Sequence, residues 1–310
     1  MKKWLQPSTR AFFTEKSIES HDSLISRMHG YAYGRWPYLY ISLATGRHPL
    51  SSQIKRLLRA ARYFSRSGSA QAMARARIKF AQGYHGKVLP VQEAKRLVQI
   101  NKSLDLGDLE QVIPYDRARR IVLQNPRHIV ALECPCRASS LDPCMPLQVC
   151  LIIGEPFAGF ILEHHPRKAR SISQEEACLI LEQEHARGHV QHAFFKDAML
   201  GRFYAICNCC SCCCGAMQAH RNGVPMLASS GFVAVPDHDS CRQCGVCAKS
   251  CPFQAVTMSL HGPLIPEDSC MGCGVCSNVC PGDALLMKRH KDKCPPLDVC
   301  RLVSFHQSAR

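Results

Sequence analysis

The sequence predicts an α+β fold in three parts, and three features of its 310 residues support this prediction. Positive charge is concentrated near the N-terminus, strand and helix patterns run into cysteines in the middle, and one cysteine motif occurs twice near the C-terminus. A chain of this length is enough for about two domains. We therefore expect a basic helical region over residues 1–90, a cysteine-rich α/β domain over 91–234, and a further domain with a short tail over 235–310.

Cysteine is the most informative residue type, since the chain contains 21. Most of them lie two or three residues apart, which is the spacing of ligands around a metal centre rather than of a disulfide scaffold. The first residues reach no apolar segment of a secretory signal. The longest uncharged run, residues 203–219, is shorter than the roughly 20 apolar residues that a membrane span needs. The sequence therefore predicts a metal-binding protein in a reducing, cytoplasmic environment.

The N-terminal region carries most of the net charge. Residues 24–91 contain no Asp or Glu and twelve Lys or Arg, which supply +12 of the formal charge of +15. Residues 51–66 predict a helix with apolar side chains on one arc and Lys55, Arg59, Arg62 and Arg66 on the other. Such a helix docks an acidic partner or lies on an anionic membrane surface. The alternative is a solvated helix that packs on its own core.

An aromatic cluster precedes this helix: Tyr31, Tyr33, Trp36, Tyr38 and Tyr40. It is interpreted as core, with a membrane-interface anchor as the alternative. From the basic region we expect a redox protein partner that is acidic or membrane-associated, with peripheral contact to the inner membrane face as one form of docking. Nucleic acid is disfavoured because no recognition motif accompanies the charge.

The strongest pattern lies near the C-terminus, where residues 241–252 and 270–281 each read C-x2-C-x2-C-x3-C-P. Three cysteines in a tight loop present thiolates to one cluster, and the fourth, followed by proline, ligates the other cluster. Two ligand sets follow, one of Cys241, Cys244, Cys247 and Cys280, the other of Cys270, Cys273, Cys276 and Cys251. Gly245 and Gly274 permit the tight turns inside the ligand loops.

On these motifs, residues 235–290 resemble the bacterial-type two-[4Fe-4S] ferredoxin family. The resemblance implies a β-α-β-β-α-β-like fold, two [4Fe-4S] clusters and one-electron transfer, with no substrate chemistry in that domain. Paired zinc sites are the alternative, although zinc motifs rarely combine the third cysteine, the x3 gap and the proline. Cys294 and Cys300, in the tail beyond the motifs, are interpreted as free thiols.

The middle of the chain carries a second cysteine system of ten residues. They are Cys134, Cys136, Cys144, Cys150, Cys207, Cys209, Cys210, Cys212, Cys213 and Cys214. We expect a helix over 114–123, strands over 128–133, 151–154, 189–195 and 202–206, and a helix over 174–187 that begins with a Ser173–Glu176 capping box. Two of these strands run into cysteines, which would bring the cysteines together at one edge of the domain. Cys178, on the helix, is interpreted as a buried apolar residue.

Ten cysteines predict at least one further Fe–S cluster in this middle domain. The alternatives are a zinc site, with His164, His165, His189 or His192 as nitrogen ligands, and a redox dithiol. The CPCR and CNCCSCCC segments also resemble a group of ferredoxin-domain fusion proteins from anaerobic microbes, which supports the architecture more than any reaction.

These patterns together predict an iron-sulfur electron carrier or oxidoreductase subunit rather than a stand-alone enzyme, and no catalytic residue is assigned. Flavin and nicotinamide binding have no motif in the sequence. One alternative is a reductase whose middle cysteine site performs the chemistry. A second is a redox-sensing DNA-binding regulator, in which the helix and hairpin at 174–206 would form a winged helix.

Overall fold

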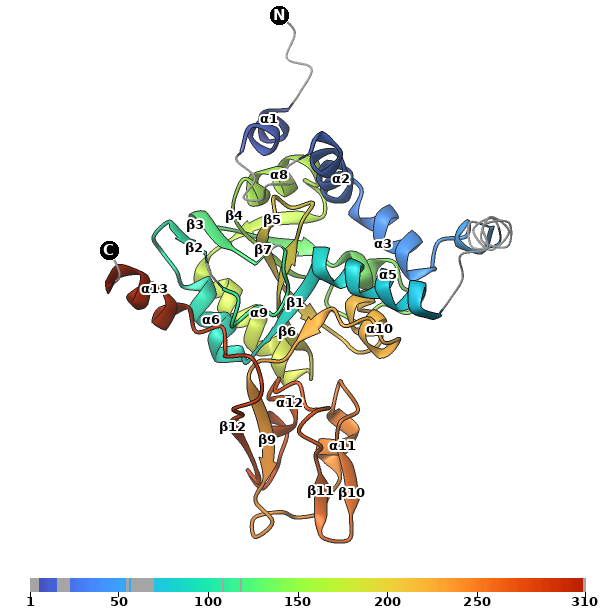
Figure 1. Cartoon of the computed structure of the whole chain (residues 1–310), viewed down its shortest axis with the longest axis vertical. Coiled ribbons are helices and arrows are strands. Elements are labelled where there is room, and N and C mark those ends of the chain that lie inside the picture. Colours follow the sequence, from blue (N-terminus) through green and yellow to red (C-terminus); the bar gives the residue numbers. More distant parts are fainter. Residues whose placement is uncertain are drawn as a thin grey trace, which may run out of the picture.

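The computed structural model describes residues 6–15, 23–53, 56, 70–107, 109–117 and 119–308 (Figure 1). Its helices are α1 (Pro7–Thr14), α2 (Leu24–Arg35), α3 (Pro37–Thr45), α5 (Ala70–Gly83), α6 (Val91–Val98), α7 (Pro135–Ala138), α8 (Phe157–His164), α9 (Gln174–Ala186), α10 (Gly215–Arg221), α11 (Val246–Ser250), α12 (Val275–Asn278) and α13 (Val299–Ser308). Its strands are β1 (Tyr84–Leu89), β2 (Leu104–Leu106), β3 (Ile121–Glu133), β4 (Gln148–Glu155), β5 (Ala169–Ile172), β6 (Val190–Lys196), β7 (Arg202–Cys209), β8 (Leu227–Ala228), β9 (Phe232–Pro236), β10 (Thr257–Ser259), β11 (Gly262–Leu264) and β12 (Leu285–Arg289).

The main body is built on one eight-stranded sheet with the order β2-β3-β4-β7-β6-β1-β8, in which β5 also pairs with β3. Among the described strand pairs of this sheet, β1–β8 is parallel and the others are antiparallel. The prediction of an α/β middle domain is wrong in this respect, because short hairpin connections such as the one between β6 and β7 enforce antiparallel pairing. The molecule is α+β with a curled mixed sheet.

Several sequence-based elements are confirmed. The strands around residues 128–133, 151–154, 189–195 and 202–206 are β3, β4, β6 and β7, and the helix at 174–187 is α9. The hydroxyl of Ser173 accepts a hydrogen bond from the Glu176 N–H, as the capping box requires. The hairpin β6–β7 lies in the centre of the sheet, paired on both sides, so it is not a free wing for DNA.

Two predicted helices are not confirmed. The helix expected over 114–123 is wrong: the described residues there form turns, and Ile121 already begins β3. The basic helix expected over 51–66 lies outside the described residues, apart from 51–53 and 56, which are helical.

The N-terminal helices pack on the main body. The ring of Phe12 on α1 is buried beside Phe160 on α8, with centroids 5.5 Å apart. From α2 and α3, Tyr33 hydrogen-bonds the hydroxyl of Tyr204 on β7 and Tyr38 donates to the carbonyl of Glu133. The interpretation of the aromatic cluster as core holds only in part, because Tyr31 and Tyr33 pack partly buried against the core whereas Trp36 is 50% exposed. Strand β1, at the end of the basic stretch, pairs with β6 inside the sheet.

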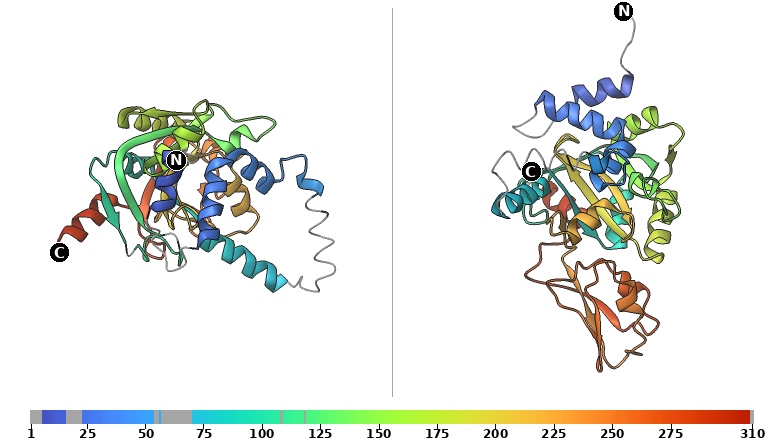
Figure 2. Two further views of the ribbon diagram at one scale, coloured as in Figure 1. Left: turned by 90° about the horizontal axis from the view of Figure 1, so that it is seen from above. Right: turned by 90° about the vertical axis from the view of Figure 1, so that its right-hand side faces the viewer.

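Residues 232–289 form a C-terminal lobe at the end of the molecule opposite α1 (Figures 1 and 2). Its elements follow the order β9-α11-β10-β11-α12-β12, which is the β-α-β-β-α-β order that the resemblance implies. Strands β9 and β12 pair antiparallel, as do β10 and β11. The chain then returns to the main body, where α13 packs beside α6 and β2. Within the described ranges, no helix has the length and apolar character to cross a membrane.

Candidate metal centres

Eight cysteines of the C-terminal lobe gather around two hollows, four at each. The first hollow is lined by Cys241, Cys244, Cys247 and Cys280, and the second by Cys251, Cys270, Cys273 and Cys276. Each hollow therefore takes three cysteines from one motif copy and the fourth from the other copy. We call the first the distal set and the second the proximal set, because the second lies beside the main body.

Local backbone geometry explains how the short motifs present their thiols. Gly245 and Gly274 precede α11 and α12 with φ of 71° and 81°, a left-handed conformation that glycine adopts without steric cost. After each motif, a backbone N–H turns back to the fourth cysteine: Ala255 N–H donates to Cys251 Sγ at 3.3 Å, and Ala284 N–H donates to Cys280 Sγ at 3.3 Å. Such donors stabilise a thiolate and tune a bound cluster.

The donor chemistry fits iron–sulfur clusters. Burial raises the pKa of Cys276 to about 12 and also raises the pKa of Cys273. Thiols with raised pKa values stay protonated at neutral pH unless a bound metal takes up the thiolate form. Soft thiolates with no carboxylate among them select zinc, Cu(I) or Fe–S clusters.

A comparison with protein-family models matches residues 234–282, which include all eight cysteines, to a family described as 4Fe-4S dicluster domain. Residues 234–282 are a 4Fe-4S dicluster domain. The dicluster domain implies two [4Fe-4S] clusters and Fe–S electron transfer. A comparison with curated proteins gives no match for this chain.

The ten middle cysteines also come together, and the sheet order explains why. Strands β3 and β7 both pair antiparallel with β4, so they run in the same direction and end at the same edge of the sheet. Cys134 follows the end of β3, and Cys209 and Cys210 stand at the end of β7. The expectation that the strand ends would gather the cysteines is confirmed.

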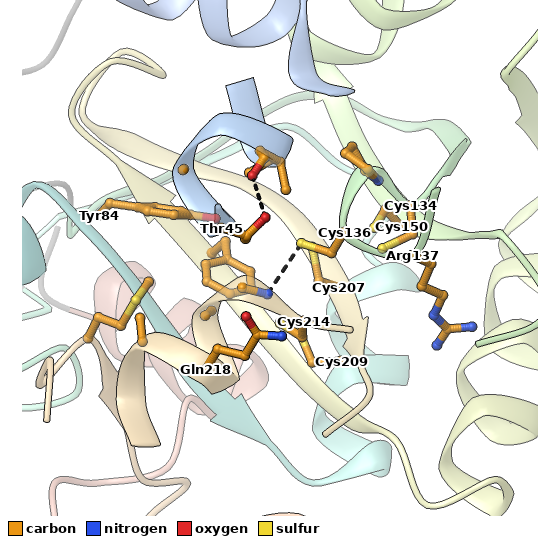
Figure 3. A pocket seen from close by; sticks show the side chains of 18 of the residues that line it. Thr45, Tyr84, Cys134, Cys136, Arg137, Cys150, Cys207, Cys209, Cys214 and Gln218 are labelled. Carbon is orange, nitrogen blue, oxygen red and sulfur yellow. Dashed lines mark hydrogen bonds between the residues drawn. The ribbon is translucent and has the colours of Figure 1, made fainter. Parts of the chain in front are cut away.

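Seven of these cysteines, Cys210 among them, line a cavity of about 410 Å³ between the sheet, α3, α7 and α10 (Figure 3). Six of the seven thiols interact as neighbours in the order Cys207, Cys150, Cys134, Cys136, Cys214 and Cys209. We call these six residues the six-cysteine set. The opposite wall is largely aromatic and apolar, and includes Tyr33, Tyr40, Phe80 and Tyr84.

Burial and neighbouring thiols raise the pKa values of Cys134, Cys136, Cys150, Cys209 and Cys214, which favours their neutral form. Hydrogen bonding to Cys136 and burial raise the pKa of Cys134 to about 12. Hydrogen bonds with Cys134 and Cys207, together with burial, hold the pKa of Cys150 well above its usual range. Six thiols without a carboxylate among them again suit a thiophilic metal or an Fe–S cluster.

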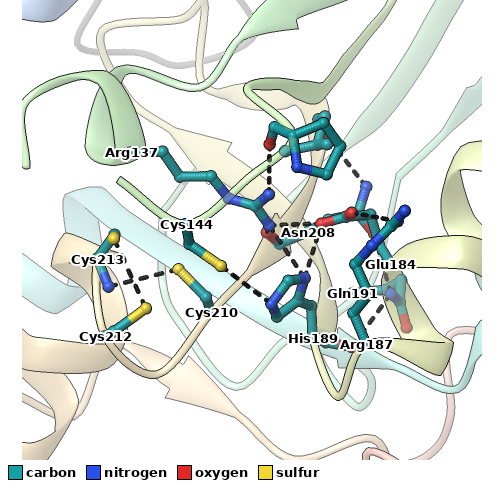
Figure 4. A network of polar contacts seen from close by, with 12 residues as sticks. Arg137, Cys144, Glu184, Arg187, His189, Gln191, Asn208, Cys210, Cys212 and Cys213 are labelled. Atoms are coloured by element: carbon teal, nitrogen blue, oxygen red, sulfur yellow. Dashed lines mark hydrogen bonds and ion pairs between the residues drawn. The ribbon is translucent and has the colours of Figure 1, made fainter. Parts of the chain in front are cut away.

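The other four middle cysteines, Cys144, Cys210, Cys212 and Cys213, form a second group (Figure 4). The sulfurs of Cys144, Cys210 and Cys212 lie within 4.8 Å of one another, and this triad could hold a metal. Cys213 Sγ lies 3.6 Å from Cys212 Sγ. Cys210 also lines the cavity of the six-cysteine set, so it lies between the two groups.

The four histidines considered as ligands have different surroundings. His164 hydrogen-bonds Thr9 and His165 hydrogen-bonds the carbonyl of Gly34, both away from the cysteines. The Nε2 atom of His189 lies 3.4 Å from Cys144 Sγ. His192 is fully buried on β6, where it is the cross-strand partner of Cys207.

Other cysteines lie apart from these groups. Cys178 is buried on α9, as expected. Cys294 is half-buried and accepts a hydrogen bond from the buried ammonium group of Lys87 at 3.0 Å. Cys300 is exposed on α13.

Sequence reasoning missed the residue that ties the two cysteine loops together. Arg47, between α3 and residue 51, donates from one guanidinium nitrogen to the carbonyl of Cys136 and from the other to the carbonyl of Cys213, both at 2.8 Å. These loops belong to the two cysteine segments, around 134–136 and 207–214, that the sequence predicts to come together. Within a stretch of twelve cations, nothing marks Arg47 as different from its neighbours.

Proposed function

We propose that the protein is an iron–sulfur electron carrier in which the dicluster domain exchanges electrons with a further Fe–S centre in the six-cysteine set. The dicluster domain supplies the one-electron chemistry through its clusters. The remainder of the chain would hold the additional centre and shield it from solvent, since four of its six cysteines are less than 8% exposed. Cys134, Cys150, Cys209 and Cys214 are those four.

Within the dicluster domain we assign the distal set to one [4Fe-4S] cluster and the proximal set to the other. Two observations support this assignment. Each hollow is lined by four cysteines from both motif copies. The two backbone donors to Cys251 and Cys280 have equivalent positions, so the fourth ligand of each set has the same local support.

The observation that carries the electron-transfer proposal is the contact between the proximal set and the main body. Phe253 follows Cys251 by two residues and lines the proximal hollow. Its ring packs against His192, with centroids 6.5 Å apart, and His192 is the cross-strand partner of Cys207 in the six-cysteine set. A short packed route of two aromatic rings therefore leads from one group of thiols to the other.

Iron analysis tests this proposal. The dicluster domain accounts for about eight irons per chain, so full-length protein prepared without oxygen should carry about twelve or more. Cys134→Ser/Cys136→Ser should return the count to about eight while the dicluster signals remain. A wild-type count of about eight would contradict the proposal.

The cavity favours a second candidate, a reductase that acts on a small organic molecule at the six-cysteine set. Its volume of about 410 Å³ falls within the roughly 300–1,000 Å³ of small-molecule sites, and its wall opposite the thiols is aromatic. An open iron site would distinguish this candidate, because cyanide would then change the spectrum of the middle centre. An unchanged spectrum favours the carrier.

The partner is proposed to be an acidic redox protein. The net charge of +15, concentrated in residues 24–91, supports electrostatic steering of such a partner. Within this stretch, the described residues Arg75, Arg77 and Lys79 are exposed on α5.

A further inference from the structure

The ten middle cysteines are divided between two chemically different environments. The six-cysteine set surrounds a cavity in the interior, whereas the triad runs from buried Cys210, which also lines that cavity, through half-buried Cys144 to exposed Cys212. The triad takes one cysteine from the loop before β4 and two from the loop after β7. Neither loop segment belongs to a helix or strand at these positions.

The spacing of the triad suits a single tetrahedral metal ion. Zinc with Zn–S bonds of about 2.3 Å and Zn–N bonds of about 2.05 Å separates two ligand sulfurs by about 3.8 Å and a sulfur from a nitrogen by about 3.6 Å. The three sulfurs lie within 4.8 Å of one another, and His189 Nε2 lies 3.4 Å from Cys144 Sγ. His189 Nε2 does not lie within 4.8 Å of all three sulfurs, so the side chains of His189 and Cys144 would have to shift to bring these four atoms around one ion.

The hydrogen bonds around His189 prepare Nε2 as a ligand. The carboxylate of Glu184 lies 2.7 Å from His189 Nδ1, and a carboxylate only accepts. Arg137 also approaches Nδ1, at 3.1 Å, but the two hydrogens of that nitrogen have Glu184 and the carbonyl of Asn208 as acceptors. Nδ1 therefore donates to Glu184, and Nε2 faces the sulfur of Cys144, where it can act as a ligand once it carries no proton.

Ion pairs hold Glu184, the hydrogen-bond partner of His189, in position. Arg137 and Glu184 are both fully buried and form an ion pair, and Arg187 pairs with the second oxygen of Glu184. Figure 4 shows the order from the buried ion pair through His189 to the thiols. A carboxylate–histidine–metal relay of this kind fixes the orientation of a ligating imidazole in zinc sites.

We propose that Cys144, Cys210, Cys212 and His189 form a Cys3His zinc site, separate from the Fe–S centres, that joins the 139–147 loop to the 209–214 loop. Four protein ligands leave no open position, so the role is structural. Cys213 is the competing fourth ligand. Its thiol donates to the carbonyl of Asp142 and also interacts with the thiols of Cys212 and Cys210, and its N–H donates to Cys210 Sγ.

Elemental analysis and zinc X-ray absorption on the full-length holoprotein test the proposal. We expect one zinc per chain with a shell of three sulfurs and one nitrogen. Cys213→Ser, the matched control in the same loop, should keep that zinc and the same shell. His189→Ala should lose zinc or bind it about 10–100-fold more weakly, as loss of support around a zinc site also does.

His189→Cys keeps the test decisive if the alanine variant does not fold. This variant should retain one zinc, change the shell to four sulfurs, and leave the iron content of the chain unchanged. The proposal is overturned if the wild type holds no zinc or shows a four-sulfur shell, or if Cys213→Ser loses zinc while His189→Ala keeps it. An iron count of about eight would reject the middle Fe–S centre but leave this zinc site intact.

Discussion

The ring of Phe253 meets the imidazole of His192 nearly edge-on, with an angle of 68° between the planes and 6.5 Å between the centroids. Phe253 belongs to the dicluster domain and His192 to the central strand β6, so this pair is a direct contact between the two cysteine-rich parts of the chain. His220 on α10 completes the contact, with its ring 5.9 Å from Phe253. Because Phe253 lines the proximal hollow, this contact with the main body distinguishes the proximal set from the distal set.

Phe253→Ala should slow electron transfer from the dicluster domain to the middle centre several-fold, because it removes the aromatic ring between them. Cluster content should not change, since Phe253 is not a ligand. Rapid-freeze electron paramagnetic resonance after mixing with a reductant would follow both centres. Leu286→Ala, an exposed site on β12 of the same lobe, is the control and should transfer at the wild-type rate. Equal rates in all three proteins would exclude this route.

Cys251→Ala should damage the cluster of Cys270, Cys273 and Cys276, not that of its sequence neighbours Cys241, Cys244 and Cys247. The reason is that Cys251 lines the proximal hollow. About four irons per chain should be lost, with the signal of the distal cluster retained. Cys280→Ala is the matched variant and should give the opposite pattern. Loss of the distal signal in Cys251→Ala would show that each motif ligates its own cluster.

Much of this architecture could be predicted from local patterns. The duplicated motif fixes its own loops, because glycine and proline positions determine how the chain turns around the thiols. The capping box at Ser173 and the alternating patterns of β6 and β7 act over a few residues and are equally visible. The β-α-β-β-α-β order of the C-terminal lobe came from the resemblance.

Other features depend on contacts between distant segments. The segment expected to be a helix has helix-forming residues, but Tyr115 is buried and stacks on His85 of β1, with ring centroids 3.8 Å apart. The division of the ten cysteines into two groups depends on how the loops that carry them pack together. His189 is distinguished from the other histidines only by Glu184, whose burial follows from the packing of α9 on the sheet.

Arg47→Gln should destabilise the main body by about 1.5–3 kcal/mol for each charged hydrogen bond that is lost. Its two donors connect the loops of Cys136 and Cys213, so the loss should also weaken metal retention at the middle cysteines. Chemical unfolding without oxygen and the rate of iron release to a chelator would measure the two effects. Arg10→Gln, at an exposed site on α1, should behave as the wild type. Unchanged stability in Arg47→Gln would mean that the loops need no such link.

Lys196 should make stability rise with pH in the alkaline range. Burial lowers its pKa from 10.5 to about 8, while its ammonium group lies over the rings of Tyr33, Tyr40 and Tyr84. Between pH 8 and 10.5 the unfolded chain binds this proton and the folded chain does not, so the free energy of unfolding increases with pH.

The variant Lys196→Met removes that proton. The free energy of unfolding of the variant should exceed that of the wild type most below pH 8. This difference should shrink by up to about 3 kcal/mol as the pH rises to 10.5. Denaturant unfolding at a series of pH values would measure the difference. Lys288→Met, at an exposed site, should show no such trend. A difference that stays constant with pH would mean that Lys196 keeps its charge in the fold.

The basic N-terminal stretch should speed the arrival of an acidic redox partner. Arg59, Arg62 and Arg66 lie outside the described residues, and the expectation rests on the charge of the sequence alone. Changing all three to Glu should slow reduction of the protein at low salt, and the difference should shrink as added salt shortens the screening length to about 8–10 Å. Cluster content should stay the same. Replacing the same arginines with Lys is the matched control, since it keeps the charge and should keep the rate. If the Glu variant instead reacts normally but no longer binds anionic vesicles, the stretch contacts a membrane surface. If neither property changes at low salt, these arginines are a solvated surface without a docking role.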